Sequence, residues 1–413
     1  MKVVFISNYI NHHQKPFCDA LYERLQDNFV FIQSEPMEEE RVNMGWDTGF
    51  ASLSYVKLMY ENEEECKKLI MNCDVLLAGW TQQVDIIKAR MRQKKITVRI
   101  SERIYREGQW KMLSPRGLVS KYFEHFKFRK GPAYLFCCGA YVASDFKLIH
   151  SYPGKMYKFG YFPETKHYNI DQLLDKKNLS ETIDILYAGR FMKLKHPEYM
   201  IRLAADLKKE SERRAADYAD PLPQFRVHMV GAGELEDTLK SMVSENGLED
   251  VVTFYGFLQP KEVRTIMERC HIHIFPSNHL EGWGAVVNES MNSACAVVAC
   301  SLAGAVPFLI NQWKNGVSYD GEDYDAMKEA VLYLMTHKLD REEMARNAYE
   351  TITSKWNADY VADNLMNIME GWLKGDKIFL EEGPLSKATP VKPSRMFLYM
   401  ESEKYRKYLD GRK

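Results

Sequence analysis

Short apolar runs alternate along the chain with longer segments in which apolar residues recur at helical spacing. The runs are apolar almost throughout, as expected of strands covered on both faces, and their alternation with helices is typical of parallel sheets. The predicted strands are KVVFIS, FVFIQ, CDVLLAG, KITVRI, AYLFCC, KFGYF, TIDILYAG, FRVHMVG, VVTFYG, HIHIFP, CAVVAC and GVSYD. The predicted helices cover residues 14–26, 61–71, 82–92, 118–128, 197–214, 234–246, 261–270, 286–294, 323–336 and 341–355.

The alternation occurs twice and predicts an α/β protein with two doubly wound parallel-sheet domains that face a central cleft. The domains are expected at 1–165 and 181–355, with a polar, charged linker at 166–180. An amphipathic helix opens the C-terminal segment 356–413, which we expect to pack back on the first domain. Ligands of open parallel sheets bind beyond the carboxyl ends of the strands, so site residues are expected in the loops that follow strands.

Composition narrows the class of protein. Of 413 residues, 46% are apolar and 27% are charged, which is typical of a globular protein. The 56 basic and 57 acidic residues leave a net charge of -1, and this balance disfavours nucleic acid as a partner. The eight cysteines form no CxxC pair, the first strand does not resemble a secretory signal, and no membrane span is evident. We therefore expect a cytoplasmic protein.

Two carboxylates in EGWGAVVNE, Glu281 and Glu289, follow the strand HIHIFP. Gly282 and Gly284 permit a tight turn and a close approach of the backbone to a ligand. A helix that begins there would offer free N–H groups to an anion, and Glu289 could accept hydrogen bonds from nearby hydroxyls. A diphosphate flanked by sugar rings fits this arrangement. An ordinary helix start with a capping acid and a solvated glutamate fits the spacing as well.

Two cations follow the strand TIDILYAG. Arg190 stands at its carboxyl end, and Lys195 precedes the next helix, near Pro197. Together they could hold an anion and stabilise a leaving diphosphate without a metal. Two solvated surface cations would give the same pattern.

The sequence GAG at 231–233 also lies between a strand and a helix. A dinucleotide fingerprint would need a third glycine, and Glu236 stands in its place. No acid stands at the end of a strand about 20 residues further on, where this fingerprint requires one. A dinucleotide site is therefore not predicted from these glycines.

From residue 183 to about 335 the chain resembles the retaining nucleotide-sugar glycosyltransferases of family four, the former group 1, which have the GT-B fold. The runs that carry the resemblance are YAGRFMKLKHPEYMI, VHMVGAGELEDTLK, VVTFYGFLQPKEV, IHIFPSNHLEGWGAVVNESMN and AVVACSLAGAVPFLI. The resemblance implies two Rossmann-like domains and transfer of a sugar, with retention, from a nucleotide diphosphate sugar to an acceptor hydroxyl. It also implies a role in the biosynthesis of polysaccharides or glycoconjugates, with no metal or other cofactor.

The resemblance further implies residue roles. Arg190 and Lys195 would hold the donor diphosphate and stabilise its departure, while Glu281 would contact the transferred sugar; these three are the expected catalytic residues. Glu289 would bind the ribose hydroxyls. The other expected donor-binding residues are Gly284, Ala285 and Val286 at the phosphate and sugar, Gly233 in a loop lining the cleft, and Phe257 near the nucleobase.

The first half shares the architecture of the family more than its motifs. The glycine-rich loop of the family is replaced by SNYINHHQKP, so His12 and His13 stand at the start of the first helix. They could bind the acceptor or a phosphate, or they could be an ordinary polar helix start. Many relatives have a histidine after the strand that corresponds to KITVRI. This chain has Ser101, Glu102 and Arg103 there, and Glu102 is the candidate polar group near the transferred sugar. The acceptor, a glycan, a lipid-linked or another hydroxyl compound, stays open.

The stretch 103–130 is basic and aromatic, with eight Lys or Arg and two acids. Such a segment can lie on an anionic membrane surface, which would make the protein peripheral at the inner face of the membrane. The aromatic side chains could instead pack into the core and leave solvated cations outside.

Two other functions fit the same architecture. A nucleotide-sugar epimerase would need acid and base groups in the cleft and no acceptor. A non-catalytic donor-binding partner of another transferase would not need Arg190, Lys195, Glu281 and Glu289 together.

Overall fold

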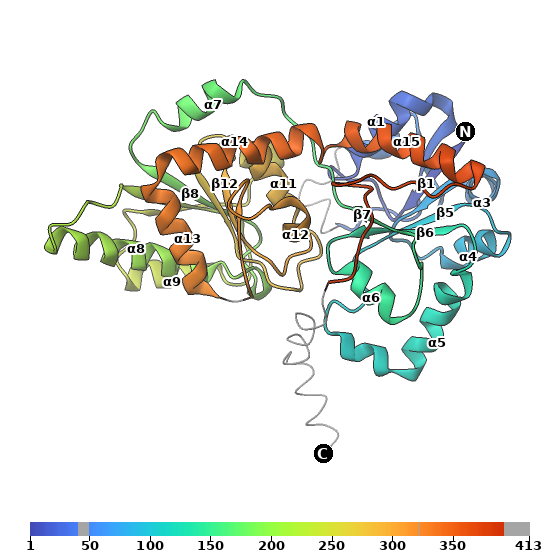
Figure 1. Ribbon diagram of the computed structural model, residues 1–413, viewed down its shortest axis with the longest axis horizontal. Helices are drawn as coiled ribbons and strands as arrows, with labels where there is room; N and C mark the ends of the chain where they lie inside the picture. The colour runs from blue at the N-terminus through green and yellow to red at the C-terminus, as the bar shows by residue number, and fades with distance from the viewer. Residues whose placement is uncertain (40–48, 322, 392–413) are drawn as a thin grey trace, which may run out of the picture. The chain divides into compact units, whose positions relative to one another are not determined.

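The computed structural model describes residues 1–39, 49–321 and 323–391 (Figure 1). Two compact units are present, one made of Met1–Glu164 with the described part of Asn357–Lys413, the other of Thr165–Trp356. Each contains a parallel sheet with helices on both faces, which confirms the predicted fold class. Of the predicted C-terminal segment, residues 392–413 lie outside the described residues.

The first unit contains a seven-stranded sheet in the order β3-β2-β1-β4-β5-β6-β7. Its strands are β1 (Val3–Ser7), β2 (Phe29–Gln33), β3 (Val56–Leu58), β4 (Val75–Ala78), β5 (Thr97–Ser101), β6 (Ala133–Cys138) and β7 (Met156–Phe159). Its helices include α1 (Lys15–Leu25), α3 (Glu63–Asn72), α4 (Val84–Arg92), α5 (Pro115–Glu124), α6 (Val142–Leu148) and α15 (Ala358–Lys374). All pairs of neighbouring strands are parallel, for example Val3 opposite Phe29.

Alternate residues of these strands point to opposite faces of the sheet and pack into two separate apolar cores. Val4 and Ile6 pack with residues of α3, α4 and α6, while Phe5 meets Phe17 of α1 edge-on at 6.4 Å between ring centroids. Because both faces are covered, most strand residues are buried and the central strands read as continuous apolar runs.

The C-terminal helix α15 belongs to the first unit and lies beside α1 (Figure 1). Trp372 stacks on Tyr134 with 4.1 Å between ring centroids, and its indole N–H donates to the Tyr157 hydroxyl at 3.1 Å. Arg24 of α1 pairs with Asp363 at 2.6 Å. The helix thus completes the apolar cover of β6 and β7.

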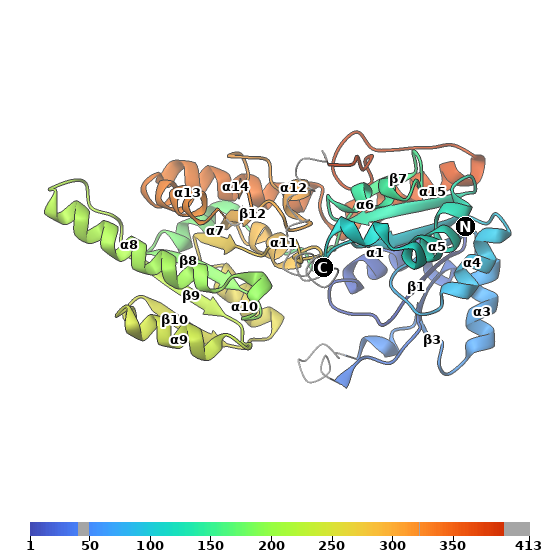
Figure 2. The ribbon, with the colours of Figure 1, turned by 90° about the horizontal axis from the view of Figure 1, so that it is seen from below.

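The second unit contains a six-stranded sheet in the order β10-β9-β8-β11-β12-β13. Its strands are β8 (Ile183–Ala188), β9 (Phe225–Val230), β10 (Val252–Gly256), β11 (Ile272–Phe275), β12 (Ala296–Cys300) and β13 (Val317–Tyr319). Its helices are α7 (Ile170–Lys177), α8 (Glu198–Ala216), α9 (Glu236–Glu245), α10 (Pro260–Met267), α11 (Ala285–Asn292), α12 (Val306–Leu309), α13 (Tyr324–Thr336) and α14 (Lys338–Ser354). Figure 2 shows α8 and α9 running beside the β8–β10 half of this sheet. Strands β8 and β11 are neighbours, so the loops that follow them leave the same edge side by side.

The stretch 166–180, expected to be a linker, contains α7 and lies within the second unit. The reason is a buried lysine that a polar composition does not reveal. The Lys177 ammonium donates to the carbonyl oxygens of Met267, Cys270 and Ala294 at 3.2, 2.5 and 2.7 Å. These carbonyls would otherwise lose a partner, so the lysine fixes α7 to the unit.

Candidate functional site

The loop after β8 is built against the loop after β9. The amide of Phe191 donates to the Ala232 carbonyl at 2.9 Å. A Cβ atom on Gly231 would stand 2.0 Å from the Gly189 carbonyl oxygen, and one on Gly233 would stand 2.4 Å from the Phe191 carbonyl oxygen. The glycines of GAG therefore serve close contact between two loops, and this contact holds the backbone beside Arg190.

Arg190 follows this contact with an exposed guanidinium. Its carbonyl oxygen accepts a hydrogen bond of 3.0 Å from the Tyr187 hydroxyl, so the backbone is fixed while the side chain extends into solvent. Within the described residues, the guanidinium has no ion pair that would compete for an anion.

Lys195 ends a short 3-10 turn, η5 (Lys193–Lys195), that is tied to the loop after β11. The Asn278 amide donates to the Leu194 carbonyl at 2.9 Å. The Lys195 ammonium lies 2.5 Å from a carboxylate oxygen of Glu281, and both side chains are 16% exposed. Two residues predicted to bind the same ligand are therefore brought together, in contact with each other.

The helix α11 begins directly after this pair. Gly284 caps it with φ of 94°, and a Cβ atom there would stand 2.5 Å from the Phe275 ring. Only glycine meets both demands without displacement of Phe275. Ala285 and Val286 are the first two helical residues and are half-buried. Their N–H groups have no acceptor within the helix, which is the usual basis of anion binding at such a terminus.

Glu289 lies further along α11 and is half-buried, and its carboxyl group has no hydrogen-bond partner among the described residues. Burial raises the pKa of its carboxyl group to about 7, against an opposing effect of the Arg264 charge. Arg264 is buried and donates to the Asn292 side-chain oxygen at 2.6 Å. The Glu289 carboxyl group therefore changes charge near neutral pH, and its oxygens can accept hydrogen bonds from a ligand.

Phe257 stands apart from these residues. It follows β10, at the edge of the sheet, and half of its surface (51%) is exposed. Three strand spacings separate β10 from β11, or roughly 14 Å. A ligand that touches both Phe257 and Glu281 must therefore be extended along the carboxyl edge.

In the first unit, the three residues proposed for the acceptor side follow the carboxyl ends of β1 and β5, and Tyr161, which follows β7, joins them. His12 and His13 lie with their ring centroids 3.9 Å apart, and the His13 ring stacks on Tyr161 at 6.0 Å. The Tyr161 hydroxyl donates to a carboxylate oxygen of Glu102 at 2.7 Å. Burial lowers the pKa of His12 to about 4, so its imidazole is neutral at physiological pH. Tyr161 is the residue that joins the group.

The basic stretch 103–130 is less uniform than its composition suggests. Arg103 is buried and pairs with Asp145, so it is not a surface cation. Lys111 and Lys121 also have acidic partners, Glu107 and Glu124. By contrast, no residue of α5 is buried. Its exposed apolar side chains, together with Leu113 before it, form what we term the α5 patch: Leu113, Leu118, Val119, Tyr122 and Phe123.

Sequence reasoning missed several residues that hold the site. Phe275 dictates glycine at 284, and Trp283 is buried with its N–H on the Asn288 side-chain oxygen at 2.9 Å. Arg264, a buried arginine on a helix, has no motif around it. Of these residues, only Trp283 could have been noticed in the sequence, because it is a tryptophan between two glycines.

No helix among the described residues is long and apolar enough to cross a membrane. In the same part of the chain, no three His, Cys, Asp or Glu side chains are grouped so that they could hold a metal ion. All eight cysteines are buried and free.

A solved structure has the same fold as this chain. HepE of Anabaena, in complex with UDP and glucose, aligns with 90% of this chain and 100% of its own with a TM-score of 0.62 at 14% identity, which bears on the fold alone. The two Rossmann-like units together match the GT-B fold.

The family is found in the second unit. Residues 169–351 match the family described as glycosyl transferases group 1. The putative colanic acid biosynthesis glycosyltransferase WcaL of Escherichia coli is 24% identical over 245 residues, 49% of this chain and 60% of that protein. A GDP-mannose-dependent alpha-(1-6)-phosphatidylinositol monomannoside mannosyltransferase of Mycobacterium tuberculosis is 26% identical over 149 residues, 35% of this chain and 38% of its own length. The matches thus span less than two thirds of these curated relatives.

Proposed function

We propose that the protein is a glycosyltransferase that moves a sugar from a nucleotide diphosphate sugar to an acceptor hydroxyl, with retention of configuration. The observation that carries the proposal is the meeting of Lys195 and Glu281 beside the first turn of α11. A cation, a carboxylate and free N–H groups at one point suit the junction between a sugar and a diphosphate.

The donor would lie along the carboxyl edge of the second sheet. Its diphosphate would meet the N–H groups of Ala285 and Val286 with Arg190 and Lys195, and its sugar would meet Glu281. Glu289 would accept hydrogen bonds from the ribose hydroxyls, and Phe257, exposed at the far strand, would stack on the base. HepE, whose structure contains UDP and glucose, supports a donor of this kind.

The chemistry follows from these charges. As the sugar–phosphate bond breaks, negative charge grows on the leaving diphosphate, and the fixed cations and N–H groups stabilise it without a metal. With no second carboxylate nucleophile assigned, we propose front-face attack, in which the leaving phosphate takes the proton of the acceptor hydroxyl. Retention follows from this geometry.

The first unit would bind the acceptor at His12, His13 and Glu102, with Tyr161 as the added member of the group. The likeness to WcaL supports a product in polysaccharide or glycoconjugate biosynthesis. We also propose a cytoplasmic location with peripheral membrane contact through the α5 patch, because the patch is apolar, exposed and flanked by Arg116 and Lys127.

The donor test uses a panel of UDP-, GDP-, ADP- and dTDP-sugars, scored first by thermal shift and then by donor hydrolysis and transfer. One donor should stabilise the protein and be consumed. Lys195→Ala and Glu281→Ala should each lower turnover by roughly 10²–10³-fold with the melting temperature retained, while Lys209→Ala on α8 should not. Wild-type turnover in either site variant would refute the assigned roles.

The same panel separates the alternatives. An epimerase would change the sugar of the donor with no acceptor present. A non-catalytic partner would bind a donor and consume none. For the membrane contact, Val119→Ser with Phe123→Ser should reduce co-sedimentation with anionic vesicles, and loss of binding at high salt is also expected.

A further inference from the structure

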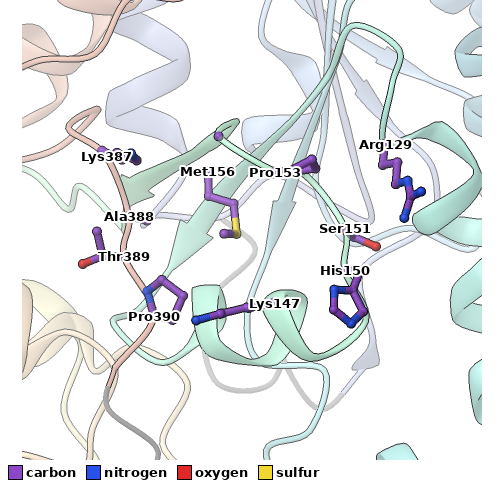
Figure 3. Close-up of a pocket in the computed structure, with 11 residues that line it drawn as sticks. Arg129, Lys147, His150, Ser151, Pro153, Met156, Lys387, Ala388, Thr389 and Pro390 are labelled. Carbon is purple, nitrogen blue, oxygen red and sulfur yellow. The ribbon is translucent and has the colours of Figure 1, made fainter.

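A cavity of about 490 Å³ opens in the first unit, away from the candidate residues described above (Figure 3). Its walls come from the end of α6, the turn that leads into β7, Arg129, and the C-terminal segment at 387–390. Met156 is the first residue of β7, so the cavity lies at the amino edge of the sheet. His12, His13 and Glu102 lie at the opposite, carboxyl edge. The cavity is therefore separate from the proposed acceptor site.

The ionisable side chains that line the cavity are all basic. Arg129, Lys147, His150 and Lys387 line it, and no Asp or Glu among the described residues does. Within the described part of the chain, none of these four side chains has an acidic partner. Four groups able to carry positive charge that face one cavity without a carboxylate repel one another, and an anion would relieve this repulsion.

A buried lysine lies next to this lining. The Lys155 ammonium donates to the carbonyl oxygens of Arg129 and Gly131 at 2.7 and 2.6 Å. Burial, and then the charge of Lys377, lowers its pKa to about 8, so it is still mostly protonated at neutral pH. It also holds the carbonyl of Arg129 and thereby fixes the start of that side chain.

The lower-polarity part of the lining restricts the ligand. Pro153, Met156, Ala388 and Pro390 present carbon atoms, and Figure 3 shows Met156 between the C-terminal segment and the turn at 150–153. In that view Arg129, Ser151 and His150 lie on one side and Lys387 with Thr389 on the other. An anion that carries a small apolar group suits this combination better than a bare ion.

We propose that this cavity binds a phosphate group carried on a small, partly apolar molecule. A phosphate ester has up to two negative charges and several acceptor oxygens, which suits cations that approach from two sides. The ester could belong to a soluble metabolite or to a phospholipid headgroup. The proposal does not depend on the glycosyltransferase activity.

The test titrates the full chain with inorganic phosphate, with glycerol 3-phosphate, and with vesicles of phosphatidylglycerol or of phosphatidylcholine alone. Binding is measured by calorimetry for the soluble probes and by co-sedimentation for vesicles. The site variant is Lys147→Ala with Lys387→Ala, both exposed and therefore expected to fold. The control variant is Lys68→Ala with Lys209→Ala, which removes the same charge from exposed positions on α3 and α8.

We expect saturable binding of at least one phosphate ester, weakened tenfold or more in the site variant and unchanged in the control. Preference for glycerol 3-phosphate would identify a soluble ester, and preference for phosphatidylglycerol vesicles a headgroup. No saturable binding of any probe, or equal loss in both double variants, would overturn the proposal. The proposal would also be overturned if vesicle binding depended on Val119 and Phe123 but not on Lys147 and Lys387. The thermal shift with UDP should be the same in these two double variants as in the unmodified protein. Failure of the phosphate-site proposal can therefore be distinguished from failure of the donor-site proposal.

Discussion

Lys195 and Glu281, 86 positions apart in the sequence, form an ion pair of 2.5 Å at the start of α11. In the absence of a ligand, the Lys195 ammonium is therefore paired with the Glu281 carboxylate. The diphosphate of the proposed donor would have to compete with Glu281 for this ammonium group, or share it. The pair thus keeps the lysine in position but reduces its attraction for an anion.

The first prediction concerns this competition. Glu281→Gln frees Lys195 from its partner and should tighten binding of UDP or the preferred nucleoside diphosphate about fivefold, as expected for a partly buried pair worth roughly 1 kcal/mol. Sugar transfer should nevertheless fall, because the carboxylate proposed to contact the sugar is lost. Calorimetry measures the first effect and a transfer assay the second. Glu210→Gln, which breaks ion pairs on α8, is the control, and unchanged or weaker nucleotide binding in Glu281→Gln would contradict the prediction.

The second prediction follows from Glu289, whose pKa is raised to about 7 by burial. The folded state favours the protonated carboxyl group, so the stability from this group is complete below the ordinary pKa of 4.5 and is lost as the pH rises through 7. Glu289→Gln should therefore stabilise the ligand-free protein at pH 8, by about 1–3 kcal/mol, and much less at pH 5. Thermal unfolding at the two pH values measures the difference, and an equal effect at both would refute it.

Donor binding should also release a proton through Glu289. In the proposed donor complex, ribose hydroxyls would donate to the ionised carboxylate and lower its pKa, so a proton should leave near pH 7. Calorimetric enthalpies should then differ between buffers of different ionisation enthalpy, and this difference should disappear in Glu289→Gln. A buffer effect that persists in the variant would assign the proton to another group.

A third prediction concerns the start of α11. Gly284→Ala places a Cβ atom 2.5 Å from the Phe275 ring at φ of 94°, and should cost about 3 kcal/mol or more. Gly247 also has positive φ, at 59°, but open space around it, so Gly247→Ala should cost only about 1–2 kcal/mol. Urea unfolding compares the two. Partial recovery in Gly284→Ala combined with Phe275→Leu is the outcome that assigns the loss to the ring.

The fourth prediction concerns the buried pair of Arg103 and Asp145. The Asp145 carboxylate accepts hydrogen bonds from the Arg103 guanidinium, the Tyr105 amide and the Gln109 side chain at 3.0–3.2 Å. Asp145→Asn leaves the arginine charge uncompensated and should cost about 3–5 kcal/mol. Glu107→Gln, in an exposed pair with Lys111, should change stability by less than about 1 kcal/mol. Similar losses in the two variants would show that burial does not determine the cost.

The sequence contained enough to predict the fold, because strands covered on both faces must be apolar throughout. Strand β3 escaped prediction because it has three residues, all half-buried, one of them Lys57. Helix α7 was not predicted because Lys177, which anchors it, is a residue type typical of the surface but is buried in the core. A pattern of polarity cannot distinguish these two.

The candidate site was predicted as a set of residues but not as an arrangement. Spacing and resemblance indicated Glu281, Glu289, Arg190 and Lys195; which of them touch depends on contacts between distant loops. Tyr161 and Arg264 were missed because each acts through a neighbour far away in the sequence, Glu102 and Asn292. The stretch 103–130 was rightly seen as basic and aromatic, yet only the structure separates the buried Arg103 from the exposed Phe123.

The placement of α15 makes the first unit discontinuous in the chain, whereas the second unit is one uninterrupted segment. During synthesis the ribosome must therefore complete the whole second unit before the helix that covers Tyr134 and Tyr157 emerges. The part of the protein that is made first is thus the part that finishes folding last. A fragment ending at residue 164 would expose an aromatic face, while the segment 165–356 can be excised without cutting either sheet.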